Sequence, residues 1–175
     1  MKRIIILAIV AAMSVATALA QPAAKYHGEV NIGYSIGVGS VPINRVMLNT
    51  IQGVKIGDFF STGLGVGLDW YRGLYADYWE SQGKVDSGEL VMPLYLNVKG
   101  YLPINTNVSP YLTFDVGYGA GVTEGVKGFG GLYLTPGVGV CFGKIKAEIG
   151  FNIQQIVENV KINANAVKLS IGYIF

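Results

Sequence analysis

The chain has 175 residues, of which 51% are hydrophobic, and its formal net charge is +2, which fits a single domain with little unbalanced charge. No basic patch with interleaved aromatic residues occurs, so nucleic acid is excluded as an expected partner. Cys141 is the only cysteine, so no disulfide can form within the chain and something other than a cross-link has to stabilise the fold.

The first twenty residues have the three parts of a secretory signal peptide. Residues 1–3 form a basic head, and residues 4–15 form an apolar run that is shorter than a transmembrane helix. Ala18 and Ala20 then supply small residues at the −3 and −1 positions of a cleavage site. We therefore expect residues 1–20 to be removed, and the mature domain to comprise residues 21–175 and to begin at Gln21.

After this segment, apolar and other side chains alternate with a period of two, which is typical of β-strands with two different faces. No second apolar run is long enough for a transmembrane helix. The alternation predicts eight strands, each long enough to cross a bilayer when it is tilted. They cover residues 27–39, 45–57, 61–72, 89–101, 109–122, 129–142, 145–157 and 165–175.

The two faces separate best in the third, fourth, fifth and seventh predicted strands. One face is apolar throughout, as with Leu64, Val66 and Leu68, whereas the other face holds glycines and polar or charged side chains. The second strand departs from this pattern, because Thr50 and Gln52 lie on its more apolar face. Its register is therefore open, with a shift or a bulge as alternatives.

Two prolines lie inside predicted strands, Pro93 in the fourth and Pro136 in the sixth. Each proline removes a hydrogen-bond donor from the ladder, which is costly inside a closed sheet. We therefore expect a β-bulge near each of them.

The last predicted strand has a continuous apolar face that ends on an aromatic residue. Its members are Val167, Leu169, Ile171, Tyr173 and Phe175. The pattern resembles the terminal strand of bacterial outer-membrane β-barrels, which the barrel-assembly machinery reads as an insertion signal. The resemblance implies Tyr173 and Phe175 as the signal residues. The alternative is an ordinary edge strand that ends in phenylalanine.

Alternation alone does not say which face is inside, and a soluble barrel such as a lipocalin would place the apolar face inward. The glycine-rich second face favours an orientation with the apolar face outside, because eight strands leave a crowded interior. The signal peptide and the terminal phenylalanine favour it too, as do aromatic residues at both strand ends, which predict two membrane girdles. The girdle residues are Phe59, Phe60, Tyr101, Tyr111, Phe142, Tyr173 and Phe175 at the periplasmic end, and Trp70, Tyr71, Tyr75, Tyr78, Trp79, Phe129 and Tyr133 at the outer end.

The connections between predicted strands alternate in length. Three short turns, 58–60, 102–108 and 143–144, fall at one end, and the outer connections are 40–44, 73–88, 123–128 and 158–164. Residues 73–88 form the longest and most polar of them. Tyr75, Tyr78 and Trp79 in this loop are a candidate extracellular contact patch, and amphipathic rings at the headgroup level are the alternative.

Most of the mature chain resembles the small bacterial outer-membrane β-barrel family, often labelled porin-like. Loose motifs carry the resemblance, and they are Gly63-Leu-Gly-Val-Gly-Leu-Asp69, Met92-Pro-Leu-Tyr-Leu96, Pro110-Tyr-Leu-Thr-Phe-Asp-Val-Gly-Tyr-Gly119 and Thr135-Pro-Gly-Val-Gly139. The architecture is similar to the transmembrane domain of outer-membrane protein A, and no periplasmic peptidoglycan-binding domain is expected.

This resemblance implies a closed eight-stranded antiparallel up-and-down transmembrane β-barrel, an all-β fold, in the cell outer membrane. It also implies two partners, which are outer-membrane lipid including lipopolysaccharide and the barrel-assembly machinery. Any extracellular ligand is left unidentified by the sequence.

Charged residues on the polar face are candidate lumen residues. The acids are Glu29, Asp69, Asp115 and Glu148, and the bases are Lys99, Lys146 and Lys168, with Arg45 and Lys55 as further candidates. A buried charge is tolerated only when it is paired. The pattern therefore predicts a charge network that fills the lumen, and an ion or proton path is the alternative.

Nothing in the sequence points to catalysis. Barrel enzymes of this membrane need a histidine, or a Ser/Asp/His set, near the outer rim, whereas the single histidine, His27, lies near the periplasmic end. No metal or cofactor motif occurs either. We therefore expect a non-enzymatic protein with a structural or surface-interaction role through its outer loops. A narrow transport path for small or hydrophobic solutes is the alternative, and a lipid-modifying barrel enzyme ranks third.

Overall fold

The computed structural model describes residues 24–39, 42–72, 88–105, 107–123, 126, 130–157 and 161–175. No helix in these ranges is long and apolar enough to cross a membrane. The predicted signal peptide and its cleavage before Gln21 lie outside the described residues. So do Tyr75, Tyr78, Trp79 and Phe129.

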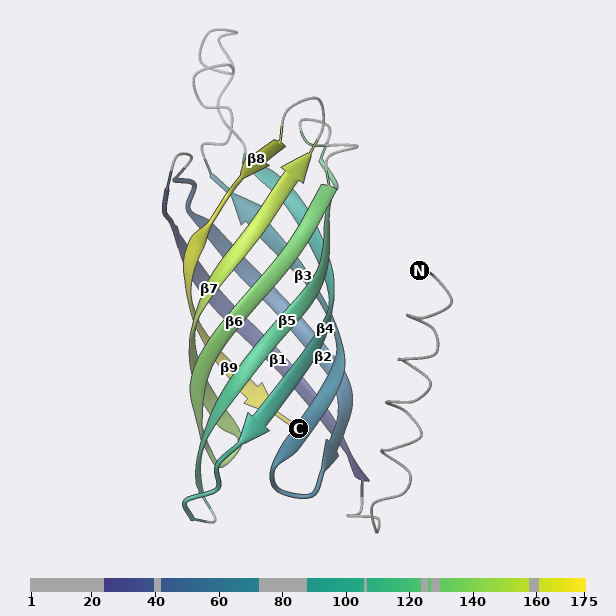
Figure 1. The fold of residues 1–175 in the computed structure, drawn as a ribbon, viewed down its shortest axis with the longest axis vertical. Helices are drawn as coiled ribbons and strands as arrows, with labels where there is room; N and C mark the ends of the chain where they lie inside the picture. Colours follow the sequence, from purple (N-terminus) through teal and green to yellow (C-terminus); the bar gives the residue numbers. More distant parts are fainter. Residues whose placement is uncertain are drawn as a thin grey trace, which may run out of the picture.

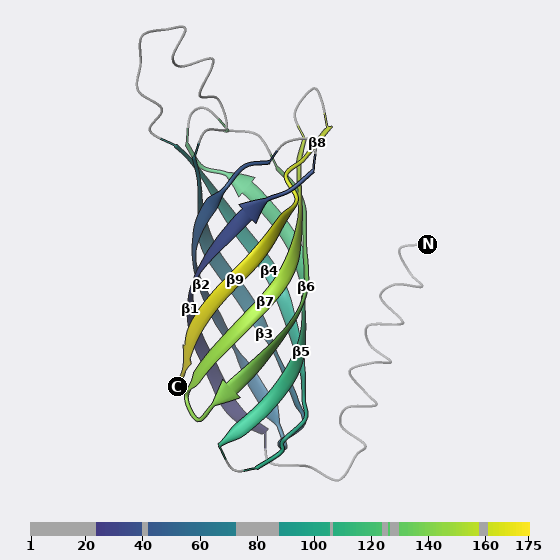
Figure 2. The same ribbon diagram turned by 90° about the vertical axis from the view of Figure 1, so that its left-hand side faces the viewer.

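The described chain is almost entirely antiparallel β-sheet. The strands are β1 (Ala24–Gly37), β2 (Arg45–Ile56), β3 (Phe60–Tyr71), β4 (Glu89–Tyr101), β5 (Val108–Gly121), β6 (Gly130–Phe142), β7 (Ile145–Val157), β8 (Lys161–Asn163) and β9 (Ala166–Ile174). From β1 to β7 each strand pairs with the next, and β9 pairs with both β7 and β1. This last pairing closes the sheet into a barrel (Figures 1 and 2).

Eight of these strands form the barrel wall, and the short β8 prolongs the wall beside the end of β7. The predicted eighth strand corresponds to β8 and β9 together. The two segments keep the same register against β7, and the Ala164 N–H between them donates to the Gln154 carbonyl at 2.8 Å. The predicted closed, eight-stranded antiparallel barrel is therefore confirmed.

The two ends of the barrel differ. One end, here called the turn end, carries the short connections 57–59, 102–107 and 143–144, the start of β1 and the C-terminus (Figures 1 and 2). Gly57 and Gly143 have φ values of 59° and 58° in these turns, a conformation that favours glycine. The opposite end is the loop end.

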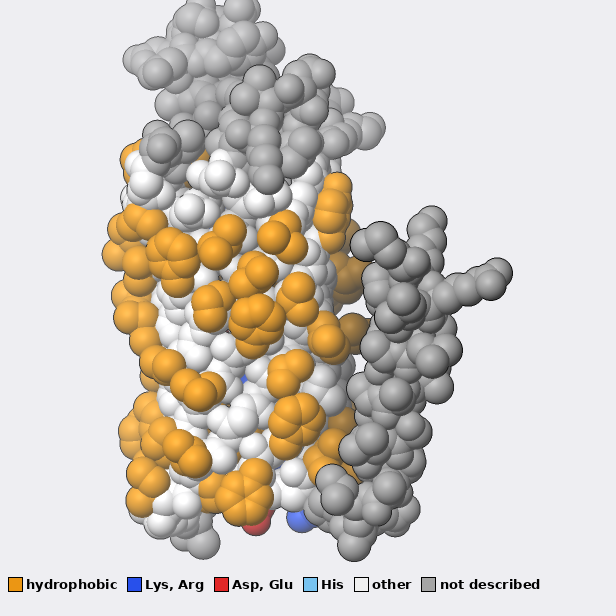
Figure 3. Space-filling view, in the orientation of Figure 1, with side chains coloured by type: hydrophobic (Ala, Val, Ile, Leu, Met, Phe, Trp, Pro, Cys, Tyr) orange, Lys and Arg blue, Asp and Glu red, His pale blue; other side chains and the backbone are white. Residues whose placement is uncertain are grey.

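The apolar face of the sheet is on the outside of the barrel. Leu64 and Leu112 are each 64% exposed and Ile149 is 48% exposed, whereas the charged side chains of Asp69 and Lys99 are almost completely buried. Figure 3 shows hydrophobic side chains spread over the height of the wall. This arrangement is the reverse of a soluble barrel and provides a surface for lipid.

The second strand has no shift and no bulge. Its pairing with β1 runs in one register from Ala24↔Ile56 to Ser35↔Arg45. Thr50 and Gln52 therefore do face outward, while Ile51 between them points into the lumen and is 4% exposed. The weak pattern of this strand comes from its composition and not from its register.

The prediction of a β-bulge at each of the two prolines is wrong. Pairing of β4 with β3 is interrupted near Pro93, and pairing of β6 with β7 is interrupted near Pro136, but each ladder resumes in the same register. On the other side, Pro93 stays paired with Gly119 and Pro136 with Phe114. Each proline thus leaves a gap in only one of its two ladders, and no extra residue is needed.

The predicted aromatic girdles are confirmed only in part. The girdle residues that face outward are Phe59, Phe60, Trp70, Phe142, Tyr173 and Phe175, and the four that are buried are Tyr71, Tyr101, Tyr111 and Tyr133. The reason is the pleat of the strands, because each buried tyrosine lies two residues, or a multiple of two, from an inward polar residue. Tyr71, for example, follows the buried Asp69 by two positions.

Candidate functional site in the barrel lumen

The lumen is filled with side chains in layers. At the turn end Tyr101, Tyr111 and Cys141 form a buried cluster, and at the loop end another cluster contains Ile43, Tyr71, Val91 and Ala164. Charged and polar side chains occupy the space between these two clusters, together with a third buried cluster of Ile51, Tyr95 and Tyr133. The layering follows from strand alternation, which places every second residue inside.

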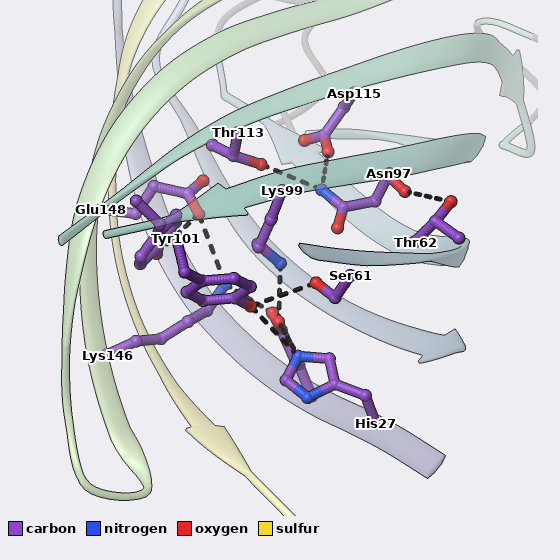
Figure 4. Close-up of polar contacts among 12 residues, drawn as sticks. His27, Ser61, Thr62, Asn97, Lys99, Tyr101, Thr113, Asp115, Lys146 and Glu148 are labelled. Carbon is purple, nitrogen blue, oxygen red and sulfur yellow. Dashed lines mark hydrogen bonds and ion pairs between the residues drawn. The ribbon is translucent and has the colours of Figure 1, made fainter. Parts of the chain in front are cut away.

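Glu29 on β1 is the centre of the charged layer nearer the turn end. Its Oε1 lies 2.6 Å from the Lys99 ammonium of β4, and its Oε2 lies 2.6 Å from the Lys146 ammonium of β7. The His27 Nε2 lies 2.7 Å from Oε1 of the same carboxylate. Three strands thus bring their charges to one point of the lumen, where Figure 4 shows the Lys99 ammonium near the His27 ring.

The network continues around the inner wall from Lys146. Lys146 lies 3.3 Å from Glu148, and the other Glu148 oxygen lies 2.9 Å from the Lys168 ammonium of β9. Lys168 in turn lies 3.8 Å from Asp115, which accepts a hydrogen bond of 2.5 Å from the Asn97 side chain. This series connects charges of β1, β4, β5, β7 and β9.

A second charged cluster lies nearer the loop end and is centred on Arg45 of β2. Its Nε lies 3.9 Å from Asp69, and its Nη1 donates to the Tyr71 hydroxyl at 2.6 Å. Its Nη2 donates to the Asn152 side chain, which itself donates to Thr135 at 2.7 Å. The guanidinium therefore has partners on two walls of the barrel.

Charge in these two clusters is balanced. The four carboxylates are Glu29, Asp69, Asp115 and Glu148, and the four cations are Arg45, Lys99, Lys146 and Lys168. Every one of these eight residues takes part in at least one ion pair. The structure therefore places all seven lumen residues expected from the sequence inside the barrel, and of the two further candidates it places Arg45 there as well. Lys55 differs, because it takes part in none of the described ion pairs and its ammonium lies 4.6 Å from the centre of the Tyr101 ring.

Sequence reasoning missed the polar residues that complete this network. Asn97, Thr113, Asn152 and Thr135 supply its hydrogen bonds, and Tyr111 donates to Glu148 at 3.0 Å. The alternation of side chains along each strand could have identified them, because each lies on the same strand face as a charged or polar lumen residue.

A serine, a tyrosine, a histidine and a glutamate meet near the turn end. The Ser61 and Tyr101 hydroxyls are 3.1 Å apart, and the Tyr101 hydroxyl lies 3.4 Å from His27 Nε2. Glu29 approaches that same nitrogen. A nucleophile, base and carboxylate triad needs its two outer members on different ring nitrogens, which this group does not provide. No cluster of three metal-ligating residues occurs in the described ranges.

The last residue takes part in barrel closure. The Phe175 N–H donates to the Gly28 carbonyl at 3.0 Å, and the Gly28 N–H donates to the Phe175 carbonyl at 3.3 Å. The Phe175 ring lies so close to Gly28 that a Cβ there would be 2.5 Å from it. Both Tyr173 and Phe175 are about half exposed on the outer surface. The two residues of the expected assembly signal thus lie beside the seam between β1 and β9.

A closed antiparallel barrel of eight strands, apolar outside and filled with polar side chains inside, is the fold of a small outer-membrane β-barrel protein. This fold and its apolar exterior indicate the cell outer membrane as the location. Two solved structures support the assignment of the fold. Neisserial surface protein A has a TM-score of 0.61 and 15% identity, with 87% of this chain and 97% of that chain covered.

The outer membrane enzyme PagL has a TM-score of 0.54 and 10% identity, with 84% of this chain and 98% of that chain covered. The Yersinia pestis outer membrane protein Ail is also similar, with a TM-score of 0.46, 15% identity, and 86% of this chain and 100% of that chain covered. The sequence matches no protein-family model and no curated protein. At these identities the likeness establishes the fold alone.

Proposed function

We propose that the protein is a non-enzymatic outer-membrane β-barrel whose structural or surface-interaction role is carried by its outer loops. The observation that supports this proposal is the filled lumen. Its buried charges neutralise one another, and apolar clusters lie at both ends. A filled lumen leaves the surface of the barrel and its loops as the parts available to a partner.

A long connection joins β3 and β4 at the loop end of the barrel. Tyr71 and Glu89 are directly paired, so these strands remain joined up to the loop end. Residues 73–87 are many more than a hairpin connection needs. We propose that Tyr75, Tyr78 and Trp79 in this segment contact outer-membrane lipid, including lipopolysaccharide, or an extracellular ligand.

The proposal gives no catalytic role to His27, for a chemical reason. His27 is the only histidine of the chain, and its described contacts are a carboxylate and a phenol within the buried network. General-base catalysis requires a base within reach of a substrate. The described surroundings of His27 are side chains of the lumen.

A narrow transport path is the second candidate, and it rests on buried polar atoms in and beside the Arg45 cluster that have no hydrogen-bond partner among the described residues. Both Asp69 carboxylate oxygens, the Asn49 Oδ1 and the Tyr133 hydroxyl are buried without a hydrogen-bond partner. Such groups favour hydration. A wetted strip through this region would connect the two charged clusters if the apolar clusters at the ends opened.

Conductance in planar bilayers separates these two functions. The barrel should show no steady single-channel conductance, and a variant with residues 73–87 replaced by Asn-Gly should fold and behave in the same way. The loop variant should also lose any binding of added lipopolysaccharide that the wild-type barrel shows in detergent. A steady, ion-selective conductance that is abolished by Lys99→Met would make transport the primary function.

A further inference from the structure

Two polar residues lie in the middle of the lipid-facing surface. On β2 the outer aromatic belt corresponds to Val46, which pairs with the girdle residue Trp70, and the inner belt corresponds to Ile56, which pairs with the girdle residue Phe60. Thr50 is four residues from Val46, and Gln52 is four residues from Ile56. Both therefore fall between the belts, at the depth of the hydrocarbon.

These residues form a chain of hydrogen bonds on the outer surface. The Tyr26 hydroxyl donates to Gln52 Oε1, and Gln52 Nε2 donates to the Thr50 hydroxyl at 2.7 Å. The Thr50 hydroxyl then donates to the Glu29 carbonyl at 3.0 Å. Tyr26 and Gln52 are exposed, so the array faces whatever surrounds the barrel.

The array uses only half of the hydrogen-bonding capacity of the Gln52 carboxamide. A carboxamide has two N–H donors and two acceptor sites on its oxygen, and the contacts above use one of each. Hydrocarbon offers no partner for the other donor and acceptor, and an unpaired amide in an apolar medium is costly. One free donor beside one free acceptor is self-complementary, since two such groups related by a two-fold axis satisfy each other.

The surface around Gln52 has a matching shape. A shallow groove of about 470 Å³ lies beside Thr50, and its lining includes Val30, Leu48, Val66 and Met92. Leu64, which pairs with Gln52 across β2 and β3, is 64% exposed. The same face thus presents a protruding leucine and a recess, which suits an interface in which one patch contacts its own copy.

We propose that the outer face of β1, β2 and β3 around Gln52 is an intramembrane docking surface for a second copy of this chain. The Gln52 carboxamides of the two copies exchange hydrogen bonds across a two-fold axis, and apolar side chains pack around them. A headgroup of a lipid does not fit this position, because headgroups lie outside the aromatic belts. This inference is independent of the proposed role of the loops.

Sedimentation equilibrium in density-matched detergent micelles tests the proposal. The wild-type barrel should associate to a dimer, and Gln52→Leu should weaken the dimer at least tenfold. Thr62→Val is the matched control, because Thr62 lies on the same outer face and its hydroxyl donates to the Asn97 carbonyl at 3.0 Å. This control should associate like the wild type, and heat modifiability on gels should show that all three barrels are folded.

Cross-linking in phosphatidylethanolamine and phosphatidylglycerol vesicles gives a second readout. In a Cys141→Ala background, Leu64→Cys should form a disulfide-linked dimer, whereas Ile149→Cys, on β7, should not. A wild type that is monomeric in both systems, or a Gln52→Leu variant that associates as tightly as the wild type, would overturn the proposal and leave lipid or a different membrane protein as the occupant.

Discussion

The Lys99 ammonium lies 2.6 Å from the Glu29 carboxylate, so a cation of β4 and an acid of β1 meet inside the barrel although 70 positions separate them in the chain. The same carboxylate holds Lys146 at the same distance. Glu29 is therefore shared by two buried ammonium groups, as Glu148 is by Lys146 and Lys168, and its removal should have a larger effect than that of a singly paired acid.

Glu29→Gln should lower the free energy of unfolding by about 3–5 kcal/mol, because it leaves Lys99 and Lys146 without their shared counter-charge. Urea unfolding of the barrel in vesicles, followed by tryptophan fluorescence, would measure the loss. Lys25→Gln is a control on the same strand, since Lys25 is exposed. Equal stability of the wild type and Glu29→Gln would show that the ion pairs of Glu29 do not stabilise the barrel.

Adding Lys99→Met to Glu29→Gln should recover part of that loss. The double variant removes Lys99, whose only described ion pair is lost in the first change, whereas Lys146 keeps Glu148, so the two effects should not add. Coupling between residues in direct contact is about 0.5–3 kcal/mol. A double-mutant cycle on the same urea curves measures it, and additive losses would contradict a direct ion pair.

Val116→Arg tests the orientation of the wall. Val116 faces outward and pairs with Leu96 and Leu134, so an arginine here would meet lipid and should cost about 2–4 kcal/mol. Val116→Leu, which keeps an apolar side chain, should have little effect. The yield of heat-modifiable barrel after refolding into vesicles gives the comparison, and folded water-soluble protein obtained without detergent would refute a lipid-facing Val116.

Changing Phe175 to Asp should slow insertion and leave unfolded protein in the periplasm. The substitution places a second carboxylate at the seam and removes the ring that lies against Gly28 and Tyr26. Cell fractionation with a heat-modifiability assay would follow the process. Leu112→Asn on the far wall serves as a control for a general loss of surface hydrophobicity, and an unchanged yield for Phe175→Asp would remove the assembly role.

Export should produce a mature chain that begins at Gln21. Mass spectrometry of the membrane-extracted protein measures this directly. Ala20→Arg should block cleavage at this site because the −1 position requires a small residue. Retention of residues 1–20 in the wild-type membrane form would contradict the signal peptide.

The fold was predictable because a period of two survives in nearly every strand. Leu64, Val66 and Leu68 alternate with Gly65, Gly67 and Asp69, and the barrel keeps that division. Strand β2 was harder to predict because its two faces exchange character locally. Ile51 fills a lumen position against Tyr95 and Tyr133, whereas Gln52 donates a hydrogen bond to Thr50 on the outer surface.

The partners inside the lumen were beyond sequence reasoning. Alternation shows that Lys99 and Glu29 point inward, but which charges meet depends on strand tilt and on the stagger of the closed barrel. The inward tyrosines are a different case. Tyr101 follows Lys99 by two positions, so the alternation along the strand would have placed it inside. Its position near the strand end suggested a girdle residue instead. The prediction of bulges was wrong because a gap in only one of the two neighbouring ladders accommodates each of Pro93 and Pro136.

The seam between β1 and β9 has a consequence for the order of assembly. Glu29 stands on β1, while its partner Lys146 stands on β7, next to the strand β9 that forms the other edge of an unclosed sheet. In such an open sheet these charges are hydrated and far apart. They lose water and gain one another only when the first and last strands join. The charge network of the lumen therefore stabilises the closed barrel and contributes little to a sheet whose first and last strands have not yet paired.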